Sequence, residues 1–272
     1  MSATANSSVD QVFDVLALIS ASQEPIGVAQ LARTLEVPTS TAHRVLATLE
    51  EAGYVTRDTT GTKYQLGLGA QELAHALLRR FPLQATSQPY LHRLAAATGE
   101  TTVLCGRVGF YRVRLASAEG TSDVHAAPRL GQTARLGDTP GGRAILAFDD
   151  ELRDAYLRWL GGGRASAAAR ALARDLDRIR KAGCVTDAYA DGRANLAMPL
   201  CGPDGRAFAS IAVEAAESAG GERAQRGRLA RLRATVEELQ ELVRERPELA
   251  SDPFAHIPPD ELSPGFEPAP PR

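Results

Sequence analysis

Three short helical patterns followed by two strand-like runs fill the first 66 residues, and this order constrains the fold most strongly. Apolar residues recur at three- and four-residue steps over 8–22, which predicts an amphipathic helix. A second helix is predicted over 28–35 and a third from Pro38 to Glu51. Pro38 suits a first helical position, where its missing N–H costs nothing, and Gly53 suits the end of the third helix.

Two strands are predicted after the third helix, over 54–57 and 63–66, with 58–62 as a hairpin loop. The order helix, helix, tight turn, helix, hairpin is that of a winged helix-turn-helix, which we assign to residues 8–67. The same order also suits a helical hairpin that packs against another protein, and this alternative stays open.

The start of the third helix is the candidate DNA-binding surface, because recognition helices present this end to base edges in the major groove. Small hydroxyl side chains allow close approach and donate to phosphates or bases. Arg44 is the side chain there that can hold a guanine through two hydrogen bonds, and His43 fits a phosphate contact better than a catalytic base. Two cations beside the hairpin are candidates for adjacent phosphates. The predicted DNA-binding residues are Thr39, Ser40, Thr41, His43, Arg44, Arg57 and Lys63.

Charge alone does not favour nucleic-acid binding. The chain has 31 basic and 33 acidic residues and a net charge of −2. Residues 1–80 hold 6 Lys and Arg against 8 Asp and Glu. Binding to DNA would therefore depend on a few well-placed cations.

The second region, 82–246, mixes strands and helices. Hairpin-linked strands interrupted by helices indicate an antiparallel sheet with helices packed on it, so the fold class is α+β. Strands are predicted over 101–108, 110–117, 124–127, 184–186, 194–201 and 206–214, and helices over 83–97, 140–147, 150–160, 166–182 and 222–246. The apolar stripe of the last helix fits core packing or a dimer seam. The proline-rich end, 247–272, is predicted to be a mostly disordered tail.

The run Val28–Val55, Val-Ala-Gln-Leu-Ala-Arg-Thr-Leu-Glu-Val-Pro-Thr-Ser-Thr-Ala-His-Arg-Val-Leu-Ala-Thr-Leu-Glu-Glu-Ala-Gly-Tyr-Val, resembles the DNA-binding half of IclR-type transcriptional regulators. The segments Leu136–Ala147 and Gly192–Leu200 resemble parts of the effector domain of that family. The resemblance implies a winged helix-turn-helix, a linker helix over 68–81 and a GAF-like α/β effector-binding domain over 82–246. It also implies dimers or dimers of dimers on palindromic operators and a response to small organic acids or related metabolites, often in the control of catabolic genes.

The segment 137–143 is the most suggestive ligand feature. Asp138 or Thr139 can cap the helix, and Gly141 and Gly142 bare backbone N–H groups at its positive end. A capped helix start with glycines chosen for close packing fits equally well. The predicted effector-binding residues are Asp138, Thr139, Gly141, Gly142, Asp187, Asn195 and Glu214.

Three positions depart from the pattern of the family: Gly137, where a histidine is common, Asn195, and the last strand at Ala212 or Glu214. If Asp187, Asn195 and Glu214 line a pocket, that pocket is more acidic than is usual in the family. The expected ligand then carries a carboxylate toward Thr139–Gly142 and an amine or several hydroxyls toward the acids. Arg112 and Arg114 share a strand face; we expect them to be solvated, with an acidic effector as the alternative partner.

Other classes of protein find little support in the sequence. No apolar run reaches the roughly 18 residues that span a bilayer, and the N-terminus does not resemble a secretory signal. Cys105, Cys184 and Cys201 lie far apart, which fits inert packing in a reducing cytoplasm and argues against a zinc site. No catalytic motif is visible and no cofactor is expected.

We therefore predict a ligand-responsive, DNA-binding transcriptional regulator rather than an enzyme, with double-stranded DNA, a small-molecule effector and a second copy of the chain as partners. The alternative is a winged-helix protein that serves only for protein–protein assembly, without specific DNA binding.

Overall fold

The computed structural model describes residues 8–22, 24–121, 130–162, 166–188, 193–216 and 221–253. The chain divides into two compact units, with the boundary between Leu77 and Leu78. This boundary lies inside the segment 68–81 that the sequence predicts as a linker. Each unit is described by itself.

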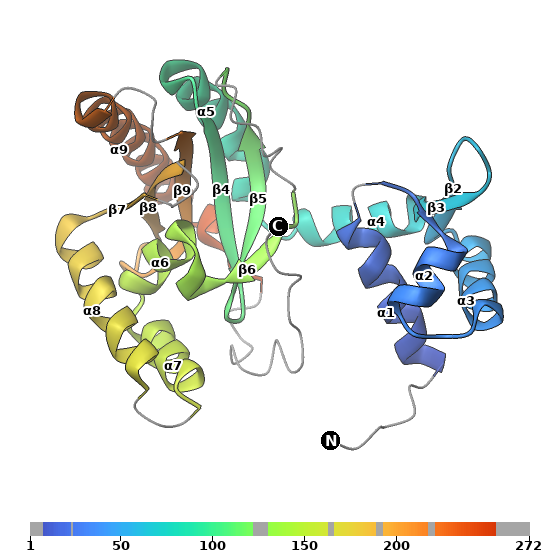
Figure 1. Cartoon of the computed structure of the whole chain (residues 1–272). Helices are drawn as coiled ribbons and strands as arrows, with labels where there is room; N and C mark the ends of the chain where they lie inside the picture. The colour runs from blue at the N-terminus through green and yellow to red at the C-terminus, as the bar shows by residue number, and fades with distance from the viewer. Residues whose placement is uncertain are drawn as a thin grey trace. The chain divides into compact units, whose positions relative to one another are not determined.

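The N-terminal unit combines three packed helices with a small antiparallel sheet of strand order β1-β3-β2 (Figure 1). The predicted winged helix-turn-helix is confirmed, because the hairpin follows the third helix as expected. The helices buried against one another share an apolar core that includes Ile19, Leu31, Leu46 and Leu49. The elements are α1 Ser8–Ala21, β1 Ile26–Gly27, α2 Val28–Thr34, α3 Thr39–Glu51, β2 Val55–Arg57 and β3 Lys63–Leu66.

The turn between α2 and α3 contains an uncommon backbone conformation. Glu36 has φ +52°, a left-handed value that few residues other than glycine adopt. Pro38 precedes α3 instead of opening it, so the predicted helix start is one residue early. Gly53 has φ +77° directly after the helix, which fits its predicted role at the helix end.

β1 is a strand that the sequence analysis does not predict. It has only two residues, and Ile26 pairs with Tyr64 of β3. A two-residue strand carries no periodicity, so only its pairing in space reveals it.

Helix α4, Leu68–Leu78, follows the wing and falls within the predicted linker 68–81. None of its eleven residues is buried, although several are large and apolar. Leu68 is 76% exposed and Leu73 is 60% exposed. A short helix with an uncovered apolar surface is marginal in water.

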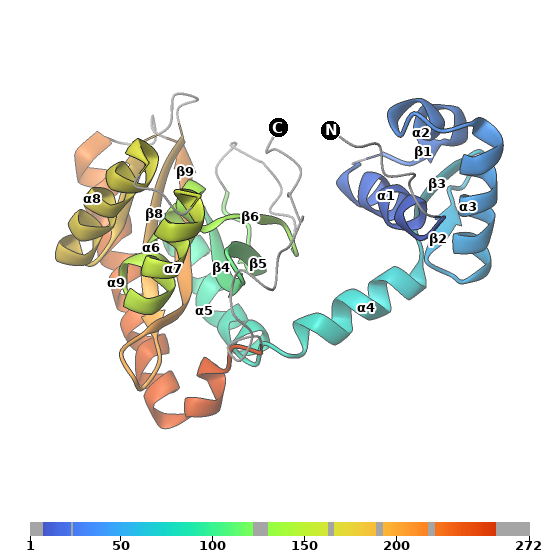
Figure 2. The same cartoon turned by 90° about the horizontal axis from the view of Figure 1, so that it is seen from below.

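The C-terminal unit is a six-stranded antiparallel sheet, in the order β6-β5-β4-β9-β8-β7, with helices on both faces (Figures 1 and 2). α5 and α9 pack on one face, and α6, α7 and α8 cover the other. The mixed α+β class is confirmed. The helices are α5 Leu83–Thr98, α6 Pro140–Ala147, α7 Asp150–Leu160, α8 Ala167–Ala182 and α9 Gly221–Glu245. The strands are β4 Thr101–Val108, β5 Tyr111–Ala118, β6 Thr133–Arg135, β7 Val185–Ala188, β8 Arg193–Cys201 and β9 Ala207–Ala216.

Most elements of the second region agree with the prediction within two residues. The exception is the third strand: the predicted strand 124–127 lies outside the described residues, while β6 occurs at 133–135 without having been predicted. The stripe of α9 packs into the core, since Leu232, Val236 and Leu239 are buried against the sheet.

The prediction of a disordered tail from residue 247 is wrong for its first part. Pro247–Ala250 form a 3-10 helix, η2, in which Leu249 is buried among core residues. Asp252 pairs with Arg107 at the end of β4. Apolar burial and this ion pair stabilise 247–253 despite the prolines. The rest of the predicted tail, 254–272, lies outside the described residues.

Candidate functional site

The start of α3 presents the side chains expected to meet DNA. Thr39, Ser40, His43 and Arg44 are exposed and Thr41 is half-buried, while Ala42, Val45, Leu46 and Leu49 face the core. The helix begins after Pro38, which gives it no side-chain cap. The N–H of Thr41 donates to the carbonyl of Pro38 at 2.9 Å, so the first-turn N–H groups without intrahelical partners are those of Thr39 and Ser40. Such groups at the positive end of a helix are suited to hold a phosphate.

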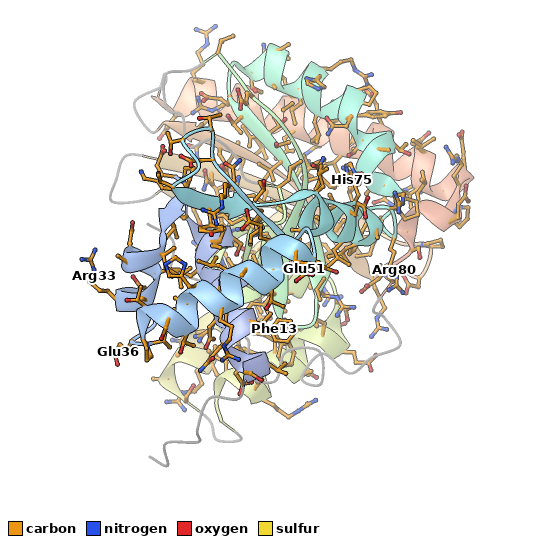
Figure 3. All side chains as sticks on the ribbon, turned by 90° about the vertical axis from the view of Figure 1, so that its right-hand side faces the viewer. Phe13, Arg33, Glu36, Glu51, His75 and Arg80 are labelled. Atoms are coloured by element: carbon orange, nitrogen blue, oxygen red, sulfur yellow. The ribbon has the colours of Figure 1, made fainter. Side chains whose placement is uncertain are left out.

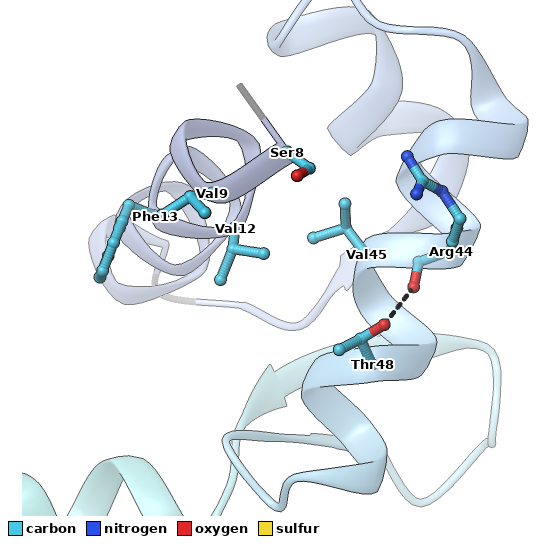
Figure 4. Close-up of a pocket in the computed structure, with 7 residues that line it drawn as sticks. All are labelled: Ser8, Val9, Val12, Phe13, Arg44, Val45 and Thr48. Carbon is cyan, nitrogen blue, oxygen red and sulfur yellow. Dashed lines mark hydrogen bonds between the residues drawn. The ribbon is translucent and has the colours of Figure 1, made fainter. Parts of the chain in front are cut away.

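Arg44 lies at the edge of a hollow of about 320 Å³ between α1 and α3 (Figure 4). Val9, Val12 and Phe13 line it from α1, and Val45 and Thr48 face them from α3. The Thr48 hydroxyl donates to the backbone carbonyl of Arg44 at 3.1 Å. The backbone at Arg44 is thereby fixed within the helix, while its side chain stays exposed.

The wing is held by hydrogen bonds to Asp58. Its Oδ1 accepts from the backbone N–H groups of Thr62 and Lys63 at 3.1 Å, and Thr60 Oγ donates to Oδ2 at 2.7 Å. The hydrogen bond from Thr60 holds the pKa of Asp58 below its usual value. The Lys63 side chain is exposed on this ordered wing.

Arg57 is engaged within the protein. Its Nε donates to Glu50 Oε1 at 3.0 Å, its Nη1 donates to the carbonyl of Gly61 at 3.0 Å, and its guanidinium lies 4.8 Å from the ring centre of Tyr64. This arrangement joins the wing to α3 and neutralises the charge of Arg57. It weighs against the predicted phosphate contact of this residue.

Exposed charges of both signs surround these elements. Figure 3 shows Arg33 at the end of α2, Glu36 in the turn and Glu51 at the end of α3. The mixed charges give this unit no strong overall attraction for DNA, so binding depends on the local contacts of Thr39–Arg44.

The start of α6 is built for close packing. Thr139 caps the helix, accepting from the N–H of Gly142 at 3.2 Å. A Cβ on Gly142 would lie 2.2 Å from the carbonyl oxygen of Leu136, and one on Gly141 would lie 3.0 Å from both Cys105 Sγ and Ser210 Oγ. Gly142 is thus required by the backbone of Leu136, and a side chain at Gly141 would press on Cys105 and Ser210. Asp138 is exposed beside them and makes no cap.

The sheet face beneath α6, which we call the α6 face, brings together the other predicted effector residues. Direct cross-strand pairs join Asp187 to Asn195 and Asn195 to Glu214. Asn195 is 9% exposed. Asp187, Asn195 and Glu214 thus lie in one row across β7, β8 and β9.

The expected acidic character of this row is wrong. Glu214 is paired with Arg114, with 2.5 Å between Oε1 and Nη2. Asp187 is paired with Arg143 of α6, which also binds Asp175 at 2.7 Å. Each carboxylate is already neutralised, so an amine on a ligand would find no free acid at Asp187 or Glu214.

The expectation that Arg112 and Arg114 are solvated is also wrong. Arg112 is 6% exposed, and the Arg114 side chain is 13% exposed. They lie on β5, a strand inside the sheet, where both faces are covered. Their burial could have been inferred from the sequence, because most residues before, between and after the two arginines in β5 are apolar, as in strands that are buried on both faces.

Cys105 lies between these groups on β4. Burial raises the pKa of its thiol, and the charges of Arg112, Arg114 and Glu214 act on it. A fully buried thiol with a raised pKa fits the predicted inert packing role.

Within the described ranges, no three His, Cys, Asp or Glu side chains are placed to hold a metal ion. No helix among those residues is both long and apolar enough to cross a membrane.

Comparison with known proteins agrees with this arrangement. Residues 8–59 match the IclR helix-turn-helix domain, and residues 75–241 match the bacterial transcriptional regulator IclR C-terminal domain. The chain belongs to the IclR family of transcriptional regulators. This IclR-family protein is thus a DNA-binding regulator with an effector-binding C-terminal domain.

Named relatives of this IclR-family chain are transcriptional regulators. It is 31% identical over 216 residues to the Pca regulon regulatory protein of Pseudomonas putida, covering 73% of this chain and 71% of the relative. It is 25% identical to the HTH-type transcriptional regulator XynR of Escherichia coli, covering 76% and 84%.

Solved structures share the fold of this IclR-family chain. The Thermotoga maritima IclR matches with a TM-score of 0.69 at 24% identity, covering 89% of this chain and 98% of that one. An IclR homologue from Microbacterium hydrocarbonoxydans in complex with 4-hydroxybenzoate matches with a TM-score of 0.70 at 22% identity, covering 88% and 100%.

Proposed function

We propose that this regulator binds a palindromic operator as a homodimer or a dimer of dimers, and that a small organic acid in its C-terminal unit alters that binding. The observation that carries the DNA-binding part is the uncapped start of α3, with Thr39, Ser40, His43 and Arg44 exposed around it. Arg44 reads a guanine, and the small hydroxyls and His43 contact phosphates. Such a protein acts in the cytoplasm, where the chromosome lies.

A second copy of the chain covers the apolar surface of α4. Leu68, Leu73 and Leu77 are exposed on this helix, and Val9 and Phe13 are exposed on α1. A palindromic site requires a two-fold pair of recognition helices. Replacing Leu73 with Gln is expected to shift the protein toward monomer in sedimentation experiments, whereas replacing the exposed polar Gln71 of α4 with Ala is not.

The effector binds between the start of α6 and the α6 face, where Asp138, Thr139, Gly141, Gly142, Asp187, Asn195 and Glu214 lie. Two findings support an acid rather than an amine. The carboxylates of Asp187 and Glu214 are paired with arginines, and a structural relative binds 4-hydroxybenzoate. A regulator that responds to such an acid would control the genes for its breakdown.

A gel-shift experiment tests this function. Purified full-length protein is titrated onto DNA from its own promoter and the neighbouring intergenic regions at two salt concentrations, then with a panel of small acids and their amides. A discrete complex on one fragment that weakens steeply with salt is expected, because phosphate contacts release counterions. If no fragment gives a specific complex under any condition, the winged helix is an assembly module and the operator proposal fails.

A further inference from the structure

Among the described residues, no carboxylate lies within ion-pairing distance of the Arg112 guanidinium on the α6 face. Arg114 and Arg143 are paired with carboxylates. Arg112 is 6% exposed, and its Nη1 is buried without a hydrogen-bond partner in the part of the chain that the structure describes. An unpaired buried charge is strongly destabilising, so this position is unfavourable unless an anion joins it.

A second buried polar atom of interest lies on the same face. Asn195 is 9% exposed, and its Oδ1 has no hydrogen-bond partner among the described residues. Buried polar atoms without partners are few in native proteins and mark places where a water, an ion or a ligand is bound.

Asn195 and Arg112 lie on the same face but at different levels of the sheet: Asn195 is level with Thr101 of β4, and Arg112 is level with Arg107, about 20 Å further along that strand. Asn195 lies directly across from Glu214, and Glu214 binds Arg114. Arg114 and Arg112 are two residues apart on β5, so their side chains leave the same side of the strand. The charges of both arginines act on the thiol of Cys105, which lies against Gly141 at the start of α6.

We propose that Arg112 is the specificity-determining residue of the C-terminal unit and binds the carboxylate of a small organic acid. The planar guanidinium matches the two oxygens of a carboxylate through parallel hydrogen bonds. The inference rests on the proposed function, which places the effector between the start of α6 and the α6 face.

The test uses the full chain and a fixed set of probes: benzoate, 4-hydroxybenzoate, pyruvate and succinate, each with its uncharged amide. Calorimetric titration and melting temperature are measured for the wild type, Arg112→Met, Arg112→Lys and Arg174→Met. Arg174 is an exposed arginine of α8 and serves as the matched control.

The wild type is expected to bind at least one acid and to reject its amide. Arg112→Met is expected to bind that acid about 10- to 100-fold more weakly, as the loss of a charged hydrogen-bond partner predicts. Arg112→Lys is expected to fall between them, because an ammonium keeps the charge without the planar fork. Arg174→Met is expected to bind like the wild type.

The melting temperature of the ligand-free protein distinguishes a binding residue from a structural one. Arg112→Met removes an unpaired buried charge, so without ligand it is expected to melt at or above the wild-type temperature. A clearly lower melting temperature, or wild-type affinity in Arg112→Met, overturns the inference. The inference is also overturned if the wild type binds none of the acids. If that same protein still binds an operator specifically, the proposed regulator function stands and only the role of Arg112 is lost.

Discussion

Arg114 and Glu214 form a two-point ion pair on the α6 face, from strands β5 and β9 that are separated by β4. Nη2 lies 2.5 Å from Oε1 and Nη1 lies 3.3 Å from Oε2. The side chains are only 13% and 22% exposed. This pair ties together three strands beneath α6.

Breaking this ion pair is expected to destabilise the C-terminal unit. Glu214→Gln should lower the free energy of unfolding by about 1–3 kcal/mol, because it leaves the Arg114 charge largely buried without its partner. Urea unfolding of Glu214→Gln, Arg114→Met and the double variant measures the coupling. Strictly additive losses would mean that the pair contributes nothing of its own.

Arg44→Ala is expected to weaken operator binding at one base position. If Arg44 reads a guanine, the loss is about 1–3 kcal/mol for the operator and much smaller for an operator with that base pair changed. Quantitative gel shifts on operator, single-base variants and random DNA measure it, with the exposed Arg33→Ala as control. An equal loss on all three DNAs would make Arg44 a phosphate contact.

Lys63→Gln is expected to weaken binding on every DNA sequence alike. A phosphate contact from the wing contributes about one unit to the slope of log K against log salt, and the variant should lose it. Binding measured across a salt series gives the slope. Lys181→Gln, the same change at an exposed lysine of α8, should keep the full slope; an unchanged slope in Lys63→Gln would remove the wing from the DNA.

Tyr156 is expected to make the stability of the C-terminal unit fall at high pH. Burial raises the pKa of its hydroxyl to about 12, above the ordinary value near 10. The unfolded state therefore loses its proton first, so the stabilisation is complete below pH 10 and is lost as the pH rises through about 12. The loss over this range is about 2–3 kcal/mol.

Unfolding curves from pH 8.5 to 12.5 for the wild type and Tyr156→Phe test this effect. The variant should show a flatter profile and a constant loss of about 1 kcal/mol, since the N–H of Gly137 donates to the Tyr156 hydroxyl at 3.0 Å. Parallel profiles for the two proteins would contradict the prediction.

The elements with long periodic patterns could be predicted from the sequence, and the short ones could not. The helices of both units and the hairpin of the wing follow apolar spacing and turn residues. β1 and β6, with two and three residues, exist because a neighbouring strand offers hydrogen bonds. No local pattern records such a neighbour.

Pairing explains the errors in the candidate site. Asp187 appeared free because its partner Arg143 lies 44 residues earlier in the chain. Arg112 appeared solvated because α6, which covers the sheet face it shares with Arg114, begins 28 residues later. The residue types were informative, but their charges were neutralised or buried by segments that the sequence does not place in space.

The 3-10 helix η2 bears on where this domain ends. The family match stops at residue 241, whereas Leu249 fills the core and Asp252 binds Arg107. A fragment that ends at residue 241 would expose the apolar core residues that Leu249 covers and would leave the largely buried guanidinium of Arg107 without Asp252. Domain truncations, fusion joints and affinity tags therefore belong after residue 253.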